Sequence, residues 1–298
     1  MHVRHLFRPG RPVFSIELFP PKTPQGVENL KKRLLDIRSF APDYISVTYG
    51  AGGSTRQGTL EICAFIKQRL GMEVSAHLTC VAHTREEVAS VLAAIRAEGI
   101  DNIMVLRGDP PKGETAFQPP PGGFRYAVEL VEAVKAWGDF GIGVAGYPEG
   151  HAEADSYAAD VTRQVEKINA GGEVLVSQFF LDNAPFLRWR DDLRARGVTI
   201  PIEAGILPAL SAQQITGFAA TCGVTVPGAL LEALEKCGDD KAASAAVGLD
   251  FALRQIEALV AEGVDGIHLY ALNRLEPIRA VEPLVRGKEG EKAEARLP

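Results

Sequence analysis

Short strand-like runs alternate regularly with helical patterns along most of this chain. Eight runs are rich in β-branched, aromatic and aliphatic residues: Val13–Phe19, Tyr44–Tyr49, Val74–Thr79, Asn102–Arg107, Gly141–Gly146, Val174–Phe179, Val198–Ala204 and Gly266–Tyr270. Between them, apolar residues recur at spacings of three and four, as in Thr84–Glu98, Tyr126–Trp137 and Tyr157–Ala170. Eight strand-helix repeats predict an α/β protein with the fold of a (β/α)8 TIM barrel.

The spacing of the runs refines this prediction. Successive runs begin about 25 to 40 residues apart, as barrel repeats do, except that Gly205–Gly263 separates the last two. This stretch predicts extra helices between strands seven and eight. A doubly wound open sheet is the alternative, but its Gly-rich first turn is replaced by Phe19-Pro20-Pro21-Lys22, and no GxGxxG follows a predicted strand. We expect one barrel domain over residues 1–285 and a flexible charged tail over 286–298.

Composition excludes several classes of function. The chain has 298 residues, 46% of them hydrophobic, and 32 basic against 38 acidic residues, so it can bury a large core but lacks the basic excess that nucleic-acid binding requires. Its four cysteines form no CxxC pair and no metal-ligand spacing, which favours reduced thiols and no metal site. No apolar stretch of membrane-spanning length occurs. We therefore expect a cytoplasmic protein without a membrane or nucleic-acid partner.

Polar residues gather where the predicted strands end. In a barrel the carboxyl ends of the strands form the catalytic face, although polar side chains also occur at strand ends simply because solvent reaches them. The residues at these ends are Glu17, Thr48, His77, Arg107, Asp109, Tyr147, His151, Gln178, Glu203 and Arg274.

Glu17 lies inside the first apolar run. Alternation in Phe14-Ser15-Ile16-Glu17-Leu18 places Ser15 and Glu17 on one face, which should point into the barrel because the outer face packs on helices. Desolvation there would raise the pKa of the carboxyl group, as a general acid at neutral pH requires. The alternative is a buried ion pair with Arg107 or Arg274.

Two further segments contain groups suited to an anionic ligand. Arg107-Gly108-Asp109 ends the fourth run with a cation, a flexible joint and an anion, and a guanidinium suits phosphate. Asp160, Arg163, Gln164 and Lys167 share one helix face. That face is either solvated or holds a diphosphate and ribose, and spacing alone favours solvation.

Eight short segments together resemble a known family, the flavin-dependent methylenetetrahydrofolate reductases of the bacterial type. They occur in the family's order over roughly residues 13–285: Ile16–Lys22, Ser46–Ala51, His77–Cys80, Leu106–Pro111, Gly146–Glu149, Gln178–Phe180, Gly205–Pro208 and Leu272–Arg274. Any one of these segments is weak evidence, whereas eight in order are strong evidence.

The resemblance implies a barrel that carries FAD and transfers hydride by a ping-pong mechanism. NADH or NADPH would reduce FAD, and 5,10-methylenetetrahydrofolate would then be reduced to 5-methyltetrahydrofolate. Glu17 matches the family's general acid, which protonates the N10 side of the folate ring. Asp109 matches an acid near the flavin and folate, Gln178 a residue shared by pterin and nicotinamide, and Arg274 one that orients the folate.

The resemblance also implies a set of FAD-binding positions. They are Thr48, Tyr49, Ala51, His77, Arg107, Gly108, Asp109, Ala127, Tyr147, His151, Ala154, Asp160, Arg163 and Lys167. Arg163 stands where some members have Asn. Ala212 stands where many members have an aromatic ring, a gap that Phe186 is a candidate to fill. The regulatory domain of longer members, with its adenosylmethionine control, is not expected.

Two other functions are compatible with such a barrel. A Schiff-base lyase would need a lysine at a strand end, and none of the eight runs contains one. A flavin- or folate-binding barrel without this activity would have no need of Glu17, Asp109, Gln178 and Arg274, which are all present. A homo-oligomer is expected, and the sequence does not distinguish NADH from NADPH.

Overall fold

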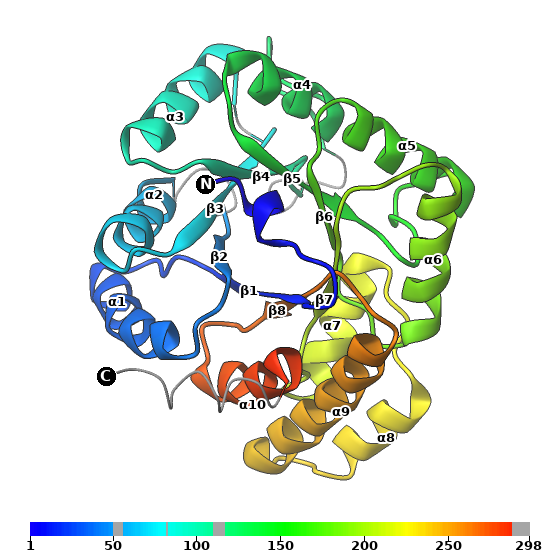
Figure 1. The fold of residues 1–298 in the computed structure, drawn as a ribbon. Helices are drawn as coiled ribbons and strands as arrows, with labels where there is room; N and C mark the ends of the chain where they lie inside the picture. Colours follow the sequence, from blue (N-terminus) through cyan, green and yellow to red (C-terminus); the bar gives the residue numbers. More distant parts are fainter. Residues whose placement is uncertain (50–55, 82, 110–116, 288–298) are drawn as a thin grey trace. The chain divides into compact units, whose positions relative to one another are not determined.

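A computed structural model describes residues 1–49, 56–81, 83–109 and 117–287 of the chain. Its strands form a closed barrel in chain order, which confirms the predicted fold (Figure 1). The strands are β1 (Val13–Leu18), β2 (Tyr44–Val47), β3 (Glu73–Thr79), β4 (Asn102–Leu106), β5 (Gly141–Gly146), β6 (Val174–Ser177), β7 (Ile202–Ile206) and β8 (Gly266–Tyr270).

Helices follow the strands in the order that a TIM barrel requires. They are η1 (Val3–Leu6), α1 (Pro24–Ser39), α2 (Arg56–Ala64), η3 (Phe65–Arg69), α3 (Arg85–Ala97), α4 (Ala127–Trp137), α5 (Tyr157–Asn169), α6 (Asn183–Ala195), α7 (Ala212–Cys222), α8 (Gly228–Glu235), α9 (Lys241–Ala261) and α10 (Leu275–Arg286).

Local sequence signals explain where helix α3 begins and ends. The Thr84 side chain accepts from the backbone N–H of Glu87, and the Glu87 carboxylate accepts from the backbone N–H of Thr84, which is a complete capping box. At the other end Gly99 has φ +74°, a left-handed conformation in which glycine costs least. The predicted segment Thr84–Glu98 is therefore α3 with its two caps.

Parallel pairing fixes which side chains share a face. Glu17 is in register with Ser46, and Ser46 is in register with Ser75 two residues before His77. Because side chains alternate along a strand, Glu17, Ser46 and His77 project from the same face of neighbouring strands. Four strands, β1, β2, β4 and β6, end one or two residues before the predicted runs did. Thr48, Arg107 and Gln178 therefore follow their strands directly, and Tyr49 is the second residue after β2.

The prediction for the seventh strand was wrong in position. The strand was expected over Val198–Ala204 but spans Ile202–Ile206. The β-branched residues at 198–200 belong to the connection after α6, where the Val198 N–H bonds to the Leu193 carbonyl and closes that helix. Pro201, which has no N–H for a sheet ladder, separates this connection from the strand.

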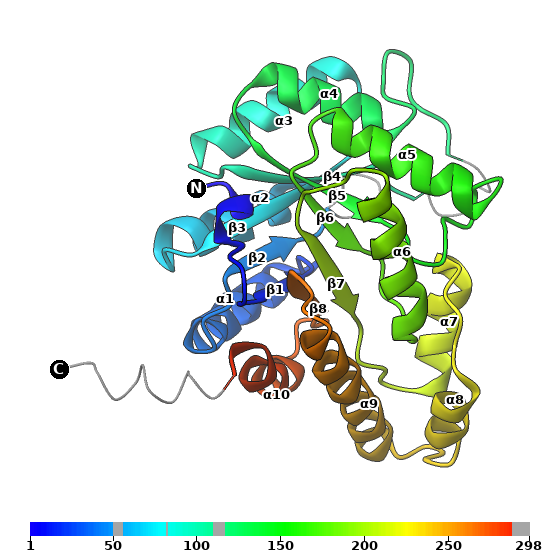
Figure 2. The ribbon, with the colours of Figure 1, turned by 45° about the vertical axis from the view of Figure 1, so that its right-hand side comes forward.

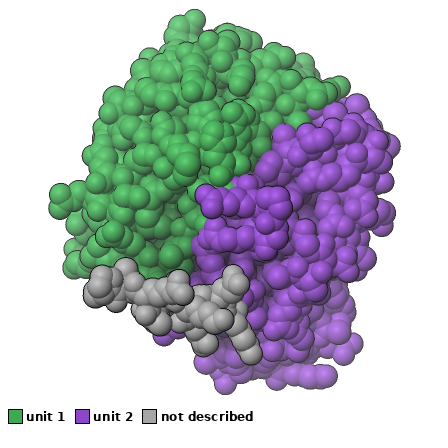
Figure 3. Space-filling model, in the orientation of Figure 1, with its two compact units in different colours: residues 1–6, 15–145, 166–175 green, residues 7–14, 146–165, 176–298 purple. Residues whose placement is uncertain are grey.

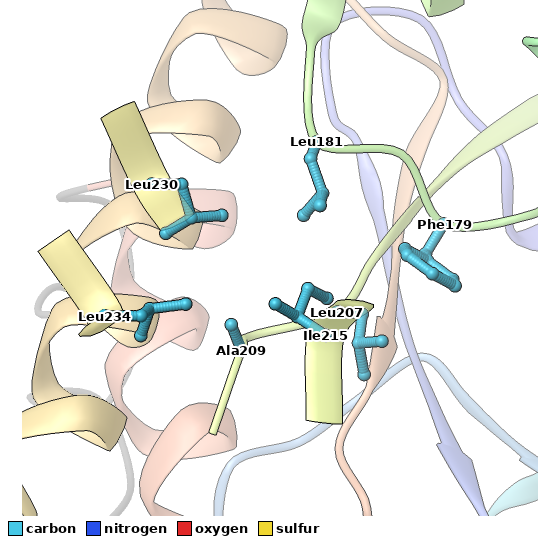
Figure 4. Packing of buried hydrophobic residues seen from close by; sticks show 7 residues of the cluster. All are labelled: Phe179, Leu181, Leu207, Ala209, Ile215, Leu230 and Leu234. Atoms are coloured by element: carbon cyan, nitrogen blue, oxygen red, sulfur yellow. The ribbon is translucent and has the colours of Figure 1, made fainter. Parts of the chain in front are cut away.

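The expected extra helices between strands seven and eight are present. They are α7, α8 and α9, drawn in yellow to orange (Figures 1 and 2). Helices α7 and α8 share a buried cluster with the segments after β6 and β7 (Figure 4), and Val247 and Phe251 of α9 pack against it. The buried residues of the cluster are Phe179, Leu181, Leu207, Ala209, Ile215, Leu230 and Leu234. Gly248 of α9 allows close packing, since a Cβ at this position would overlap the Ala209 carbonyl oxygen.

Contacts within the chain divide it into two compact units (Figure 3). Unit 1 comprises residues 1–6, 15–145 and 166–175, and unit 2 comprises residues 7–14, 146–165 and 176–298. Helix α10 includes Arg286, the first residue of the expected tail, and residues 288–298 lie outside the described part.

Candidate active site

In unit 1, the Glu17 side chain contacts a histidine of β3, and that histidine contacts a serine of β2. Its carboxylate lies 3.4 Å from His77 Nε2, and the same nitrogen lies 2.6 Å from Ser46 Oγ. The His77 and Ser46 side chains are buried, whereas the Glu17 side chain is 20% exposed. Glu17 therefore lies on the interior face, as its alternation predicted, and has a histidine as a partner.

The segment after β2 is tied to α2 and to a histidine beyond β3. Thr59 Oγ1 donates to the Thr48 carbonyl at 2.9 Å, and the Tyr49 hydroxyl lies 2.8 Å from His83 Nε2. The two rings meet edge to face, and His83 is fully buried. His83 was not among the predicted site residues, because it lies four residues beyond the end of β3 and outside every segment that resembles the family. Ala51, another predicted cofactor residue, lies outside the described residues.

The segment after β4 places a cation beside an anion. Arg107 lies over the Phe117 ring, with 5.6 Å from its guanidinium carbon to the ring centroid, and its Nε donates to the Gly108 carbonyl. Gly108 has φ +84°, and a Cβ there would lie 2.7 Å from a Val81 methyl group. A side chain is therefore excluded at Gly108 by conformation and by space. Asp109 is exposed, and Pro110 and Pro111 lie outside the described residues.

A small cavity of about 200 Å³ lies between α2, β3 and α3, and its lining includes Tyr49, Thr59 and His77. The same three residues belong to the polar groups described above, so the cavity adjoins the candidate site in unit 1.

Lys167 of α5 points back to the end of β5. Its Nζ donates to the Ala145 carbonyl at 2.5 Å. An ammonium group has three donors and a full charge, so this bond fixes the position of a cation at the carboxyl end of a strand. Resemblance assigned Lys167 to the cofactor, and this placement is consistent with that role.

In unit 2, Asp160 and Gln164 of the same helix face are buried, so the solvated interpretation favoured by spacing is wrong for these two residues. Asp160 Oδ2 accepts from the His151 backbone N–H at 3.1 Å and from Gln164 Nε2 at 2.7 Å. Gln164 Oε1 accepts from the indole N–H of Trp189 at 2.9 Å. Arg163 alone is exposed, and its guanidinium is 3.5 Å from Asp155. Asp160 thus holds the turn that carries His151.

Other cofactor positions predicted from resemblance lie close to that turn or begin a helix. The Tyr147 and His151 rings meet edge to face with centroids 4.7 Å apart. The His151 carbonyl accepts from the Ala154 N–H at 2.9 Å, which keeps the turn compact. In unit 1, Ala127 is the first residue of α4, directly after Tyr126.

The ends of β6, β7 and β8 meet through Ser177 and Tyr270. The Tyr270 hydroxyl donates to the Ser177 carbonyl, and the Gly205 N–H donates to Ser177 Oγ, both at 2.8 Å. Gln178, the next residue, accepts from the Phe179 N–H through its own Oε1. Tyr270 was not among the predicted site residues, although its position as the last residue of a strand was a usable signal.

Arg274 follows an unusual backbone segment. Leu272 and Asn273 have φ values of +50° and +57°, which is uncommon for residues other than glycine. Such conformations collect at functional sites, where surrounding structure holds them. Arg274 then precedes α10, and its Nε lies 3.6 Å from the Glu276 carboxylate.

Phe186 does not supply the aromatic ring that is missing at Ala212. It belongs to α6, is fully buried, and stacks on Phe180 at 4.7 Å between centroids. Ala212 begins α7 and packs at the margin of the apolar cluster. Because the Phe186 ring is buried and packed against Phe180, it cannot contact a ligand. The expectation that Phe186 fills the gap at Ala212 is therefore wrong.

The described residues contain neither a candidate metal site nor a membrane-spanning helix. They contain no group of three or more His, Cys, Asp or Glu side chains arranged around a possible metal position. No helix among them is both long and apolar enough to span a membrane. None of the four cysteines, all of which lie in the described part of the chain, forms a disulfide.

Comparison with known proteins relates the chain to one family. Residues 2–283 match the family described as methylenetetrahydrofolate reductase. The chain is 38% identical over 282 residues to methylenetetrahydrofolate reductase (NADH) 1 of Arabidopsis thaliana, covering 91% of this chain and 48% of the relative. It is 36% identical over 267 residues to the 5,10-methylenetetrahydrofolate reductase of Escherichia coli strain K12, covering 90% of this chain and 88% of the relative. The chain thus spans about half the length of the plant relatives.

Solved structures with little sequence similarity share the fold. An uncharacterized protein from Clostridium thermocellum, which binds two copies of 5-methyl-5,6,7,8-tetrahydrofolic acid, aligns with a TM-score of 0.62 at 15% identity over 93% of this chain and 94% of that one. Dihydropteroate synthase from Xanthomonas albilineans aligns with a TM-score of 0.53 at 15% identity, over 97% and 94% respectively. The match over almost the whole barrel leads to one conclusion: the chain belongs to the methylenetetrahydrofolate reductase family.

Proposed function

We propose that this chain reduces 5,10-methylenetetrahydrofolate to 5-methyltetrahydrofolate, with NADH or NADPH as electron donor and FAD as cofactor. Membership of the family supports the reaction, and relatives named for NADH favour that donor. The observation that carries the proposal is the position of Glu17, a partly buried carboxyl group on the interior face of β1. The family's general acid corresponds to this residue.

The chemistry of the candidate site suits FAD. Its diphosphate needs cations and N–H donors, and Arg107 and Lys167 both lie at carboxyl ends of strands. His151 is held by Asp160 in a turn that could meet the nucleotide half. FAD would supply the carrier that accepts hydride from the nicotinamide and gives it to the folate. We assign to it Thr48, Tyr49, His77, Arg107, Gly108, Asp109, Ala127, Tyr147, His151, Ala154, Asp160, Arg163 and Lys167.

Glu17 has the central chemical task in this proposal. Its carboxyl group holds a proton and gives it to N10 of the folate, so that the C–N10 bond breaks and a 5-iminium cation forms. Asp109 offers a negative charge that favours this cation electrostatically. Gln178 binds the pterin and Arg274 orients the rest of the folate. Glu17 and Asp109 lie within or follow β1 and β4 in unit 1, and Gln178 and Arg274 follow β6 and β8 in unit 2.

A lyase that uses a Schiff base has less support. Strands β1 to β8 contain no lysine, and the Lys167 ammonium that reaches β5 comes from a helix and is bonded to a carbonyl. Such an enzyme needs an amine inside the pocket that can lose its proton.

Visible absorbance and product identification test the proposal. The purified protein should be yellow or become yellow with added FAD, and with NADH it should convert methylenetetrahydrofolate to the 5-methyl product. A protein that stays colourless with FAD and leaves the folate unchanged would refute the proposed function. We also propose a cytoplasmic homo-oligomer, for which light scattering should give a mass above the 32.0 kDa of one chain.

A further inference from the structure

The far end of helix α7 is fastened to the turn that follows β5. The Glu149 carboxylate of this turn accepts from the backbone N–H of Thr225, at 3.2 Å to Oε1 and 3.1 Å to Oε2. Thr225 lies three residues beyond the end of α7. We propose that Glu149 is a positioning residue, which holds α7 in place and thereby maintains the affinity for the nicotinamide donor. This inference rests on the proposed function.

The two ends of α7 show that this helix lies at the rim of the barrel formed by the carboxyl ends of the strands. Five residues separate Ala212, its first residue, from the end of β7. Just after its last residue comes Gly223, where a Cβ would lie 3.6 Å from the Cβ of Ala152, in the segment after β5. The return to the amino ends of the strands is made by α9, which precedes β8. Helix α7 therefore lies where barrel enzymes bind their ligands.

The connection after α7 has two sides with different contacts. Cys222, Val224 and Val226 pack against the apolar cluster of unit 2. The residues between them, Gly223 and Thr225, meet the segment after β5 instead. The connection is thus held on one side by apolar packing and on the other by the bond to the carboxylate.

The turn after β5 has a defined backbone that suits an anchor. The Gly150 N–H donates to the Tyr147 carbonyl at 3.1 Å, which places Pro148 and Glu149 at the two central positions of a β-turn. Proline at the first central position fixes one backbone angle there. His151, which we assign to FAD, follows two positions after Glu149. The same turn therefore carries a cofactor residue and the anchor of α7.

A carboxylate is the right group for this anchor. A charged acceptor forms a stronger hydrogen bond than a neutral one. Within the described residues Glu149 forms no ion pair, so no cation competes for its oxygens. Solvent reaches both Glu149 and Thr225, which reduces the contribution of the bond. Loss of the carboxylate should release this end of α7 while the apolar cluster stays folded, and should weaken donor binding about three- to tenfold.

Glu149→Ala removes the anchor, and three other variants are compared with it. Glu149→Gln keeps an acceptor oxygen and should restore most of the parent behaviour. Thr225→Ala keeps the backbone N–H and should behave as the parent protein does. Glu166→Ala removes an equal charge from an exposed position of α5 and is the matched control.

Amide hydrogen exchange, followed by NMR, tests the anchor without any turnover. The Thr225 amide and the last turn of α7 should exchange about fivefold faster or more in Glu149→Ala than in the parent protein. Glu166→Ala and Thr225→Ala should leave these rates unchanged. Equal exchange in Glu149→Ala and Glu166→Ala would overturn the inference.

Rapid mixing of the FAD-loaded protein with NADH, or with NADPH if that is the donor, tests the functional consequence. In Glu149→Ala the donor concentration that gives half the limiting rate of flavin reduction should rise about three- to tenfold. FAD content and the limiting rate should stay within about twofold of the parent values. An unchanged donor dependence, or a loss of FAD, would overturn the inference. Absence of flavin reduction in the parent protein would instead refute the proposed function, while the exchange rates would still show whether Glu149 anchors α7.

Discussion

Trp189 donates its indole N–H to Gln164 Oε1 at 2.9 Å, and both side chains are fully buried. The bond connects α6 to α5, where Gln164 in turn donates to Asp160. Gly146 makes room for the indole, since a Cβ there would lie 2.3 Å from the ring. One tryptophan therefore supports the helix face that holds the His151 turn.

Replacement of Trp189 by Phe should show how much this hydrogen bond contributes to the free energy of unfolding. The variant keeps most of the ring but leaves the Gln164 oxygen without its indole donor in a dry environment, which costs about 1 to 3 kcal/mol of unfolding free energy. Denaturant unfolding measures the effect. Trp137→Phe, at a partly exposed tryptophan, is the control and should change stability little. Equal losses in both variants would contradict this account.

Lys167→Ala should weaken FAD binding about tenfold or more. Charge-assisted hydrogen bonds contribute about 1.5 to 3 kcal/mol each, and Lys167 is a cation anchored at the end of β5. Dialysis followed by absorbance measures flavin retention. Lys32→Ala, on the exposed side of α1, removes the same charge elsewhere and should retain FAD as the parent does. If Lys167→Ala retains it equally well, this assignment is wrong.

Ala212→Phe should improve the apparent affinity for the electron donor by a factor of about two to ten. An aromatic contact contributes about 0.5 to 1.5 kcal/mol of binding free energy beyond the contribution of buried area. The Phe186 ring does not already occupy this position, because it is packed against Phe180. Steady-state kinetics with NADH and with NADPH measure the Michaelis constants. Gln213→Phe adds a ring at the next, exposed position and serves as the control. Loss of donor binding in Ala212→Phe would show that the pocket has no space for a ring.

Cys80 should resist alkylation at pH 8. Burial, with a further contribution from the Glu129 carboxylate, raises the pKa of its thiol to about 12, and burial also raises the pKa of Cys63. An unfolded thiol ionises near pH 8.5, so the contribution of Cys80 to stability is complete below that pH and is lost as the pH rises toward 12. Mass spectrometry after iodoacetamide treatment should find Cys222 and Cys237, which are partly exposed, modified first. Early modification of Cys80 would contradict its buried position.

The sequence predicts the barrel and the inward orientation of Glu17 well, because both depend on local periodicity. Alternation along Phe14–Leu18 decides the face of one strand without reference to any other. The contact of Glu17 with His77 could not be predicted in this way, because it depends on the register of three strands that are distant in sequence. No local sequence pattern indicates that register.

Burial of the α5 face was also beyond sequence reasoning. Asp160 and Gln164 look like surface residues by type, and only the approach of Trp189 from α6 makes them interior ones. The predicted bounds of β7 were wrong for a related reason. The β-branched residues at 198–200 favour a strand locally, but the connection from α6 and Pro201 determine where pairing starts.

Glu17→Gln should separate the two halves of the reaction. The amide keeps the size of the side chain but has no acidic proton, so reduction by NADH should continue while the folate step slows by about 10²- to 10⁴-fold, the range of general acid catalysis. Glu28→Gln, at an exposed position on α1, is the matched control. Equal damage to both halves by Glu17→Gln would mean that Glu17 is structural.

Anaerobic rapid mixing of the FAD-loaded protein tests the central claim most directly. Flavin absorbance should disappear on mixing with NADH, or with NADPH if that is the donor, and should return when methylenetetrahydrofolate is added, with formation of the 5-methyl product. In Glu17→Gln only the first change should keep its rate. A flavin that the nicotinamide reduces but methylenetetrahydrofolate does not reoxidise in the parent protein would contradict the account.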